Sequence, residues 1–526
     1  MRAFIALSWV TAALAAPSFS YETIHHGAAP ILSSTSAEEI PNSYIIKFKD
    51  HVTAASASEH HSWVQKIHGE RENERMELRK RGQIPLIDDV VDVFTGLKHT
   101  LKIGTGFLGY AGHFDDAVIE EVRKHPDVEY IEKDQIVYAL ETPETEKSAP
   151  WGLARISHRE TLNFGTYNKY LYAADGGEGV DVYVIDTGTN IDHVDFEGRA
   201  KWGKTIPKGD EDEDGNGHGT HCSGTVAGKK YGVAKKAHVY AVKVLRSNGS
   251  GSMSDVMSGV EWAAEAHMEQ VEAAKNGKRK GFKGSTANMS LGGGKSPSLD
   301  QAVNAAVSAG LHFAVAAGND NADACNYSPA AAEKAITVGA SALDDSRAYF
   351  SNYGKCVDIF GPGLSIQSTW IGSNHAINTI SGTSMASPHL CGLTAYFLSL
   401  QPASDSDYGM AAITPEKMKS NMLSIATKGA LSEIPEDTPN LLAWNGGGYS
   451  NYSQIVKEGG YAAKKTPEST LTLEDLEQAI EDDFKVVSGK IVDGISTFSD
   501  KAEKFSEKIH DLVDEELKDF LKELRA

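Results

Sequence analysis

Three residues of this 526-residue chain have the types that an attack on a carbonyl group requires: Asp186, His218 and Ser384. Ser384 lies in the run Gly-Thr-Ser-Met-Ala, whose small side chains let a substrate come close to the backbone. A helix is expected to begin here with Pro388 in its first turn, where the N–H that proline lacks has no intrahelical partner. A serine at a helix N-terminus meets free N–H groups and a dipole that favour developing negative charge.

The segments around these residues predict where each side chain lies. Residues 180–186 form an apolar run typical of a buried strand, which places Asp186 at the carboxyl end of a strand. His218 lies 32 residues later between two glycines, where it can begin a helix with its ring directed into a cleft. A second apolar run, 311–317, precedes Asn319 and brings a side-chain amide to the same edge. Because sites in open α/β sheets form outside the carboxyl ends of the strands, all four segments should meet in a doubly wound, mainly parallel sheet.

Each residue type suits one step of acyl transfer. A serine hydroxyl is a weak nucleophile, so Ser384 needs a base, and neutral His218 can take its proton and later deliver it to the leaving amine. Asp186 would hold the imidazole in the right tautomer and stabilise the imidazolium. The Asn319 amide and the backbone N–H of Ser384 would donate hydrogen bonds to the oxyanion. The sequence therefore predicts amide hydrolysis through an acyl-enzyme on Ser384.

The order Asp, His, Ser and the residues around each of them resemble the subtilisin-like serine proteases. The similarity is greatest to the proteinase K branch and to fungal vacuolar or secreted relatives of the cerevisin type. It runs from about Ala149 to about Asn445 and implies a serine endopeptidase in which Asn319 is the oxyanion residue. It also implies two backbone segments that pair with an extended peptide substrate, and these contain Ser250 and Gly251, and Ser290, Leu291, Gly292 and Gly293.

The specificity is predicted less directly, and two alternatives stay open. Small and apolar residues at 291–294 and 316–318 favour a broad pocket for apolar or aromatic side chains before the scissile bond. The acidic run 210–214 leaves open a processing protease specific for basic residues, although such runs are more often solvated loops. A catalytically inactive module that holds extended peptides in the cleft is the alternative from a different class.

The N-terminal residues 1–16 have the features of a secretory signal peptide: a basic start, an apolar stretch and small residues at the end. The apolar stretch is too short for a transmembrane helix, and no later run reaches about 18 residues. We therefore expect a chain that enters the secretory pathway and ends in the extracellular space or the vacuolar lumen, with no membrane span.

Residues 17–140 are predicted to form a propeptide. Its inhibitor-type domain, about 43–139, resembles the small ferredoxin-like α+β propeptide domain of the same proteases. The expected elements are a strand at 43–48, a helix at 56–80, a strand pair at 106–114, a helix at 115–125 and a strand at 128–132. This domain would template folding of the parallel sheet and inhibit the enzyme until self-cleavage somewhere in 136–148, a polar, proline-containing linker.

The catalytic domain is predicted at 148–445, and residues 446–526 form a C-terminal extension. Three glycines at 446–448 are expected to end the catalytic domain. The tail beyond Pro467 is acidic, with apolar residues at helical spacing, and we expect it to be removed during maturation.

The four cysteines are too few for a dense disulfide scaffold. The resemblance implies a disulfide between Cys325 and Cys356 and a buried free thiol at Cys222. Cys391 stands where the family usually has alanine. A catalytic cysteine is not expected because the serine set is complete, although a thiol near the site predicts sensitivity to mercurials.

Composition limits the partners. A net charge of −21 argues against nucleic acid as a main partner. The resemblance implies protein and peptide substrates and the chain's own propeptide as partners, and we expect a monomer. The chemistry requires no cofactor. The resemblance implies a structural Ca²⁺ on the Asp358 carboxylate and the backbone carbonyls around Glu333 and Ala335, although a proline common at that site is absent.

Four N-glycosylation sequons occur in the chain. Asn451 and Asn248 are favoured as modified residues because both lie in polar segments. Asn288 falls in a predicted substrate strand and Asn326 adjoins Cys325, so neither is expected to carry a glycan.

Overall fold

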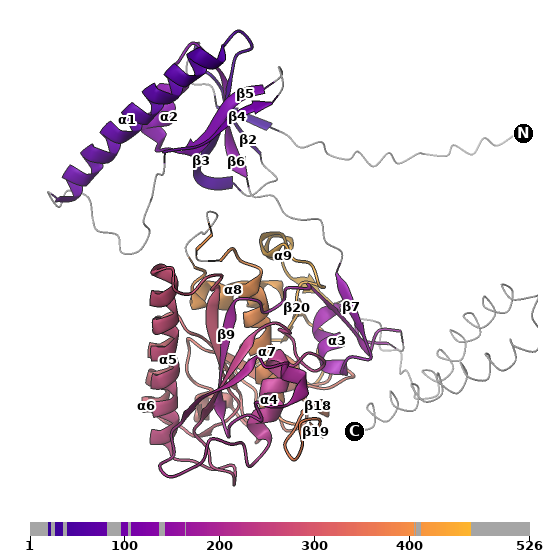
Figure 1. The fold of residues 1–526 in the computed structure, drawn as a ribbon. Coiled ribbons are helices and arrows are strands. Elements are labelled where there is room, and N and C mark those ends of the chain that lie inside the picture. The colour runs from indigo at the N-terminus through magenta and orange to yellow at the C-terminus, as the bar shows by residue number, and fades with distance from the viewer. Residues whose placement is uncertain are drawn as a thin grey trace, which may run out of the picture. The chain divides into compact units, whose positions relative to one another are not determined.

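The chain forms two compact units, residues 1–139 and 140–526, in a computed structural model (Figure 1). The predicted signal peptide, the tail beyond residue 463 and part of the predicted cleavage window lie outside the described residues. The structure describes residues 19–22, 27–34, 39–80, 96–103, 107–135, 143–163, 165–403, 405–406 and 412–463.

The first unit is a six-stranded sheet of order β1-β2-β6-β3-β5-β4 that packs against two helices (Figure 1). Its elements are β1 (Phe19–Glu22), β2 (Ile31–Ser34), β3 (Glu39–Phe48), α1 (Ala54–Lys80), β4 (Gly96–Ile103), β5 (Phe107–His113), α2 (Asp116–Val122) and β6 (Val128–Gln135). From β3 to β6 this is the βαββαβ succession of a ferredoxin-like domain, which the sequence predicted. Ile46 and Phe48 of β3 meet Val64 of α1 and Val118 of α2 in its core.

One prediction for this unit is wrong. Residues 106–114 are not a strand pair, because they contain the single strand β5. Its hairpin partner is β4, which the sequence analysis missed, and β5 also pairs with β3. The strands β1 and β2 were missed as well and extend the sheet beside β6.

The second unit is built on a ten-stranded sheet of order β10-β11-β9-β12-β14-β16-β17-β21-β20-β22. Neighbouring strands from β10 to β21 are parallel, and β20 runs antiparallel to β21. These strands are β9 (Val180–Asp186), β10 (Ala200–Thr205), β11 (His238–Lys243), β12 (Gly284–Met289), β14 (His312–Ala316), β16 (Ile336–Ser341), β17 (Ile359–Pro362), β20 (Thr427–Lys428), β21 (Leu441–Leu442) and β22 (Tyr461–Ala462). The predicted mainly parallel sheet is confirmed.

Helices cover both faces of this sheet, as a doubly wound fold requires (Figure 1). On one face lie α4 (His218–Ala227) and α7 (Thr383–Ser399), and on the other lie α5 (Met253–Lys275) and α6 (Pro297–Ser308). Alternate residues of β9 serve the two cores: Val182 and Val184 pack with α4 and α7, while Tyr183 and Ile185 pack with α5 and α6. Burial on both sides explains why residues 180–186 are almost continuously apolar.

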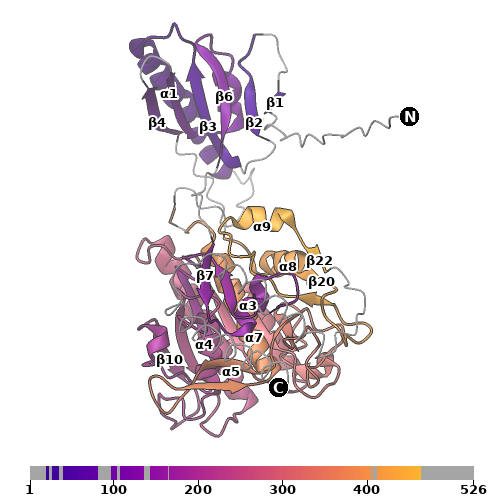
Figure 2. The same ribbon diagram turned by 90° about the vertical axis from the view of Figure 1, so that its right-hand side faces the viewer.

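The second unit extends beyond the predicted catalytic boundaries at both ends. In the predicted linker, β7 (Glu144–Lys147) pairs with β8 (Lys169–Tyr172), and Glu146 forms an ion pair with Lys235 at 2.7 Å. Beyond the three glycines, α9 (Tyr452–Glu458) packs on α8 (Pro415–Ile425), with Asn421 Nδ2 donating to Tyr452 Oη at 2.9 Å. Strand β22 then joins the sheet beside β20 (Figure 2). The predicted limits of 148 and 445 are therefore too narrow.

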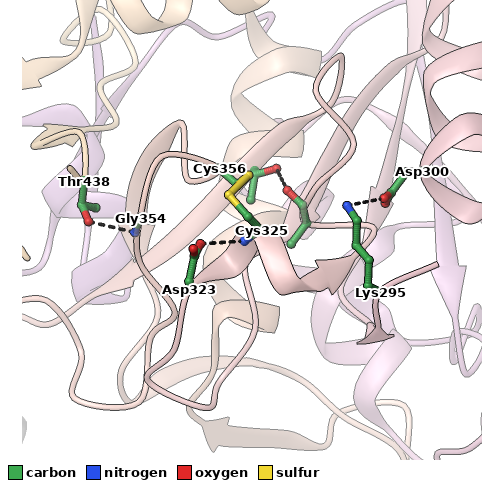
Figure 3. Close-up of a disulfide and its surroundings, with 9 residues drawn as sticks. Lys295, Asp300, Asp323, Cys325, Gly354, Cys356 and Thr438 are labelled. Atoms are coloured by element: carbon green, nitrogen blue, oxygen red, sulfur yellow. Dashed lines mark hydrogen bonds and ion pairs between the residues drawn. A yellow bond between two sulfur atoms is a disulfide. The ribbon is translucent and has the colours of Figure 1, made fainter. Parts of the chain in front are cut away.

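The disulfide implied by the resemblance is formed between Cys325 and Cys356 (Figure 3). Asp323 accepts a hydrogen bond from the Cys325 N–H at 2.9 Å, and Gly354 N donates to Thr438 Oγ1 at 2.8 Å. These bonds hold both cysteine-bearing segments. Cys222 and Cys391 are free thiols and are buried.

Candidate active site

Asp186 and His218 are brought together at the carboxyl end of β9. Asp186 is the last residue of that strand, and its Oδ1 lies 2.8 Å from His218 Nδ1. The same oxygen accepts the Thr187 N–H at 2.7 Å, while Oδ2 is buried without a hydrogen-bond partner among the described residues. The carboxylate therefore fixes the ring through Nδ1 and leaves the other ring nitrogen, Nε2, for a reacting group.

A buried carboxylate, Asp214, shapes the start of α4. Its Oδ1 accepts hydrogen bonds from Thr187 Oγ1 at 2.9 Å and from the Gly217 N–H at 2.9 Å. Its Oδ2 accepts the N–H of Thr220 at 2.9 Å, and Thr187 Oγ1 in turn accepts the N–H of Gly219 at 2.9 Å. These bonds satisfy the free N–H groups of a helix N-terminus and tie it to the end of β9.

Two glycines are required where α4 meets the strand. Gly217 has φ +101°, and a Cβ there would lie 2.6 Å from the Trp370 ring. A Cβ at Gly219 would lie 2.1 Å from the Gly188 carbonyl oxygen. Any larger residue would push the helix, and with it His218, away from Asp186.

The surroundings of His218 raise its pKa above 6.5. Burial by itself lowers the pKa, but the charge of Asp186, the hydrogen bond to it and the charge of Asp214 together outweigh burial. Both carboxylates thus favour the imidazolium that forms when the histidine accepts a proton. The base is neutral, and ready to act, only above this raised pKa.

Ser384 lies in the first turn of α7, which begins at Thr383. The helix begins at the predicted run, but Pro388 falls in the second turn and not in the first, as was predicted. Proline cannot donate to the Ser384 carbonyl four residues earlier. That carbonyl instead accepts Ser290 Oγ at 2.7 Å and Cys222 Sγ at 3.4 Å, which anchors the serine from two other elements.

The Ser384 hydroxyl donates to the Ser290 carbonyl at 3.0 Å. Rotation about the Cα–Cβ bond releases this weak bond. Hydrogen bonds of a catalytic set are often rearranged before substrate binds and tighten in the complex, so this rotamer is compatible with a nucleophile.

Two N–H donors lie close to a single point beside Ser384. Asn319 Oδ1 accepts the Thr383 N–H at 2.8 Å and Thr383 Oγ1 at 2.9 Å, so its Nδ2 must point elsewhere. A methyl group built on Gly382 would lie 3.5 Å from Asn319 Nδ2 and 3.5 Å from the Ser384 nitrogen. Both donors therefore border the same small space, as an oxyanion site requires.

A cleft of about 480 Å³ adjoins His218. All six residues predicted to bind a substrate backbone line it, at Ser250, Gly251, Ser290, Leu291, Gly292 and Gly293. Apolar side chains also line it, from Leu245, Met253, Val256 and Leu299. Residues 316–318, which were also predicted to form a specificity pocket, do not line this cleft.

Cys222 lies within 4.8 Å of the ligand atoms of Asp186 and His218, an arrangement that could be mistaken for a metal site. Burial raises the pKa of this thiol well above 9, so it stays protonated. A protonated thiol is a poor nucleophile, so Cys222 is not a second candidate for the attacking group. The contact between Asp186 and His218 suits proton transfer.

The acidic run 210–214 is partly used within the fold. Asp210 lies 3.7 Å from the buried Lys243 ammonium and 3.8 Å from Arg246, and Asp212 accepts Thr205 Oγ1 at 2.6 Å. Asp214 is buried and the acids at 211, 212 and 213 are exposed, but none of residues 210–214 lines the cleft beside His218. This arrangement does not favour specificity for basic residues.

The predicted calcium ligands do not fit an ion in this chain. The Lys419 ammonium contacts Asp358 Oδ2 and the carbonyls of Glu333 and Ala335, which are the same three groups. A cation from the chain itself thus takes the expected position of Ca²⁺.

The sequons differ in exposure. Asn248 lies in an exposed turn beside the cleft, and Asn451 is the N-cap of α9 and half-buried. Asn288 is fully buried and donates to Ser290 Oγ at 2.9 Å, while Asn326 is exposed. Within the part of the chain that the structure describes, there is no helix with the length and apolar character needed to cross a membrane.

Three residues that position the site were missed by sequence analysis: Thr187, Asp214 and Thr383. Thr187 directly follows Asp186, Asp214 lies four residues before His218, and Thr383 directly precedes Ser384. A carboxylate just before a predicted helix start was a usable signal for a cap. The hydrogen bonds of the two threonines depend on the tertiary fold and had no such signal.

Comparison with known families gives two matches. Residues 177–441 match the model described as the subtilase family, and residues 43–140 match the model described as peptidase inhibitor I9. The subtilase match falls in the second unit, and the inhibitor match falls in the first unit except for its last residue.

Several fungal proteins are similar over most of their length. A subtilisin-like proteinase, Spm1, of Pyricularia oryzae is 69% identical over the whole of both chains. A subtilisin-like serine protease of Davidiella tassiana is 65% identical, again over the whole of both chains. Alkaline protease 2 of Aspergillus fumigatus is 67% identical over 88% of this chain and 92% of the relative.

A solved structure is also similar, the crystal structure of a cold adapted subtilisin-like serine proteinase. It is 41% identical with a TM-score of 0.50, and the match covers 57% of this chain and 99% of that one.

Proposed function

This chain belongs to the subtilase family of serine proteases, and on that premise we propose that Ser384, His218 and Asp186 carry out its peptide-bond hydrolysis. The protein is a serine endopeptidase made as a zymogen with an I9 inhibitor domain. The observation that carries the assignment is the pair of donors, Asn319 Nδ2 and the Ser384 N–H, that border one space beside the nucleophile.

The reaction proceeds in two halves. Ser384 Oγ attacks the carbonyl carbon while its proton passes to His218 Nε2, and the oxyanion accepts hydrogen bonds from Asn319 Nδ2 and the Ser384 N–H. The C–N bond then breaks, and His218 gives the proton to the departing amine. Water then attacks the acyl carbon while the same nitrogen takes its proton. The bond from that carbon to Ser384 Oγ breaks, and His218 returns the proton to Oγ. Asp186 stabilises the imidazolium in both halves.

We propose a broad specificity with preference for apolar or aromatic side chains before the scissile bond. The apolar residues Leu245, Met253, Val256 and Leu299 beside the substrate segments support an apolar peptide. The raised pKa of His218 supports activity at neutral to alkaline pH. The name alkaline protease 2, borne by one relative, agrees with this proposal.

The first unit is proposed to inhibit the enzyme to which it is joined until the linker is cut. The proposed cut lies before Glu144, within residues 136–142. Later cleavage would remove part of β7, whose pairing with β8 and whose Glu146–Lys235 ion pair belong to the catalytic unit.

The route and processing of the chain are also proposals. Residues 1–16 act as a signal peptide, and the mature enzyme is a monomer outside the cell or in the vacuolar lumen. Asn248 and Asn451 carry glycans, and the acidic tail is removed. Asn248 has the stronger structural support of the two because it is exposed.

The test is labelling with a fluorophosphonate, which reacts only with an activated serine. The processed protein should be labelled at Ser384, and Ser384→Ala and His218→Ala should not be labelled. A folded, processed protein that binds peptide but resists the probe would instead be a binding module. A peptide library would show apolar preference, and a requirement for Lys or Arg before the cut would overturn the specificity proposal.

A further inference from the structure

Lys419 of α8 reaches three oxygen atoms from distant parts of the chain. Its Nζ lies 2.8 Å from the Glu333 carbonyl oxygen, 2.6 Å from that of Ala335 and 2.7 Å from Asp358 Oδ2. The two carbonyls come just before β16, and Asp358 comes just before β17. One side chain therefore ties α8 to the amino ends of two neighbouring strands.

The Lys419 ammonium uses all of its hydrogen-bond donors in this contact. An ammonium group has three N–H donors and no acceptor, and here each donor has an oxygen at hydrogen-bond distance. Asp358 Oδ2 also accepts the Thr337 N–H at 2.8 Å, which fixes the carboxylate. The side chains of Lys419 and Asp358 are only 17% and 21% exposed, so the pair is shielded from solvent.

The same three oxygens are the groups expected to bind a structural calcium ion. Calcium takes oxygen ligands at about 2.3–2.6 Å, and Nζ lies only a few tenths of an ångström farther from them. The ion and the ammonium would need the same position. Their charges would also repel, so Lys419 and calcium exclude each other here.

We propose that Lys419 is a built-in replacement for calcium, and that this chain binds no calcium at Asp358. The ammonium bridges α8, the segment before β16 and the segment before β17, as a bound ion would, but it cannot be removed by a chelator. The inference goes beyond the proposed function and does not depend on it, because its readout is stability and not catalysis.

The test compares thermal unfolding of the second unit in EDTA and in millimolar calcium, by calorimetry. All chains carry Ser384→Ala, which prevents self-digestion. The parent is compared with Lys419→Ala, with Lys419→Ala combined with Asp358→Asn, and with Asp358→Asn alone. Lys417→Ala is the matched control because Lys417 is an exposed lysine on the same helix.

Lys419→Ala should lower the Tm in EDTA by about 5 °C, since it leaves a shielded carboxylate without its partner. Calcium should restore part of this loss, because the variant opens a cavity beside three oxygen ligands. The recovery should vanish when Asp358→Asn is added. Any response of the parent to calcium should be unchanged by Asp358→Asn, and Lys417→Ala should behave as the parent.

Two results would overturn the proposal. One is a calcium-dependent Tm in the parent that Asp358→Asn abolishes, because calcium would then bind beside Lys419. The other is a Lys419→Ala protein that is as stable as the parent in EDTA, or that gains no response to calcium. If Lys419→Ala does not fold, the proposal is tested by calorimetric titration of calcium into the parent and into Asp358→Asn. Equal calcium binding by the two chains supports the proposal. Binding that is present in the parent and lost in Asp358→Asn refutes it.

Discussion

Two carboxylates lie at opposite edges of the parallel sheet, and each is paired with a different kind of base. Asp186 is the last residue of β9 and lies 2.8 Å from His218 Nδ1. Asp358 directly precedes β17 and lies 2.7 Å from Lys419 Nζ. Because β9 and β17 run in the same direction, the first pair lies at the carboxyl edge and the second at the amino edge.

The two pairs differ in what they do: the pair of Asp186 and His218 serves catalysis, and the pair of Asp358 and Lys419 serves stability. Imidazole titrates near neutral pH and has a second nitrogen, so His218 can exchange a proton with a substrate while Asp186 holds it. Lys419 uses all three of its ammonium donors inside the fold. The histidine pair keeps a free nitrogen and can support chemistry, whereas the lysine pair has every donor occupied and connects elements of the fold.

The largest effect is expected at the carboxyl edge. Asp186→Asn should lower kcat by about 10⁴-fold, because an amide can donate to Nδ1 and so favours the wrong tautomer of His218. The measurement is the hydrolysis of an apolar chromogenic peptide by the processed enzyme.

Asp192→Asn is the control, since Asp192 is an exposed carboxylate a few residues farther along the chain. It should leave kcat within about twofold, as surface substitutions usually do. A fall of less than tenfold for Asp186→Asn would mean that this carboxylate does not orient the base.

The next effect tests the oxyanion site. Asn319→Ala should lower kcat by about 10²–10³-fold with little change in KM, because its donor acts on charge that exists only in the transition state. Exposed Asn374→Ala is the control. A rise in KM at constant kcat would assign Asn319 to ground-state binding instead.

At the amino edge the expected effect falls on stability alone. Asp358→Asn should lower the free energy of unfolding by about 2–3 kcal/mol, because it leaves the Lys419 ammonium shielded without its counter-charge. Urea unfolding of the Ser384→Ala chain gives this free energy, and kcat of the active enzyme should stay within twofold. If Asp358→Asn lost activity at unchanged stability, the pair at the amino edge would serve catalysis, which would contradict this assignment.

The smallest effect concerns pH. The value of kcat/KM should rise with an apparent pKa above 6.5, because Asp186 and Asp214 stabilise the imidazolium. Asp214→Asn removes one negative charge, so the pKa of His218 should fall and the rise should move to lower pH. Exposed Glu213→Gln is the control, and an unmoved profile in Asp214→Asn would show that its charge does not act on the histidine.

Local patterns predicted the carboxyl edge well. The apolar run 180–186, the glycines around His218 and the small residues around Ser384 each mark a strand end or a helix start, and a doubly wound sheet brings such ends together. Some missed elements also had signals. Residues 96–103 alternate with apolar Leu97, Leu101 and Ile103, and Asn451 precedes a helix as a typical N-cap.

The remaining features are set by tertiary pairing. Strand β7 reads Glu-Thr-Glu-Lys, which has no apolar alternation, and it is extended because it pairs with β8. Lys419 lies on α8 more than sixty residues from Asp358 in sequence and meets it only once the sheet is formed. No local pattern could show that a lysine takes the position expected for calcium.

The most direct test of the account is mass spectrometry of the expressed chain beside Ser384→Ala, with both assayed on an apolar peptide. The native chain should be cut within residues 136–142, lose the residues before that cut and hydrolyse the peptide, while Ser384→Ala should keep its propeptide and be inactive. If Ser384→Ala matured by the same cut and hydrolysed peptide at the native rate, Ser384 would not be the nucleophile and the account would be wrong.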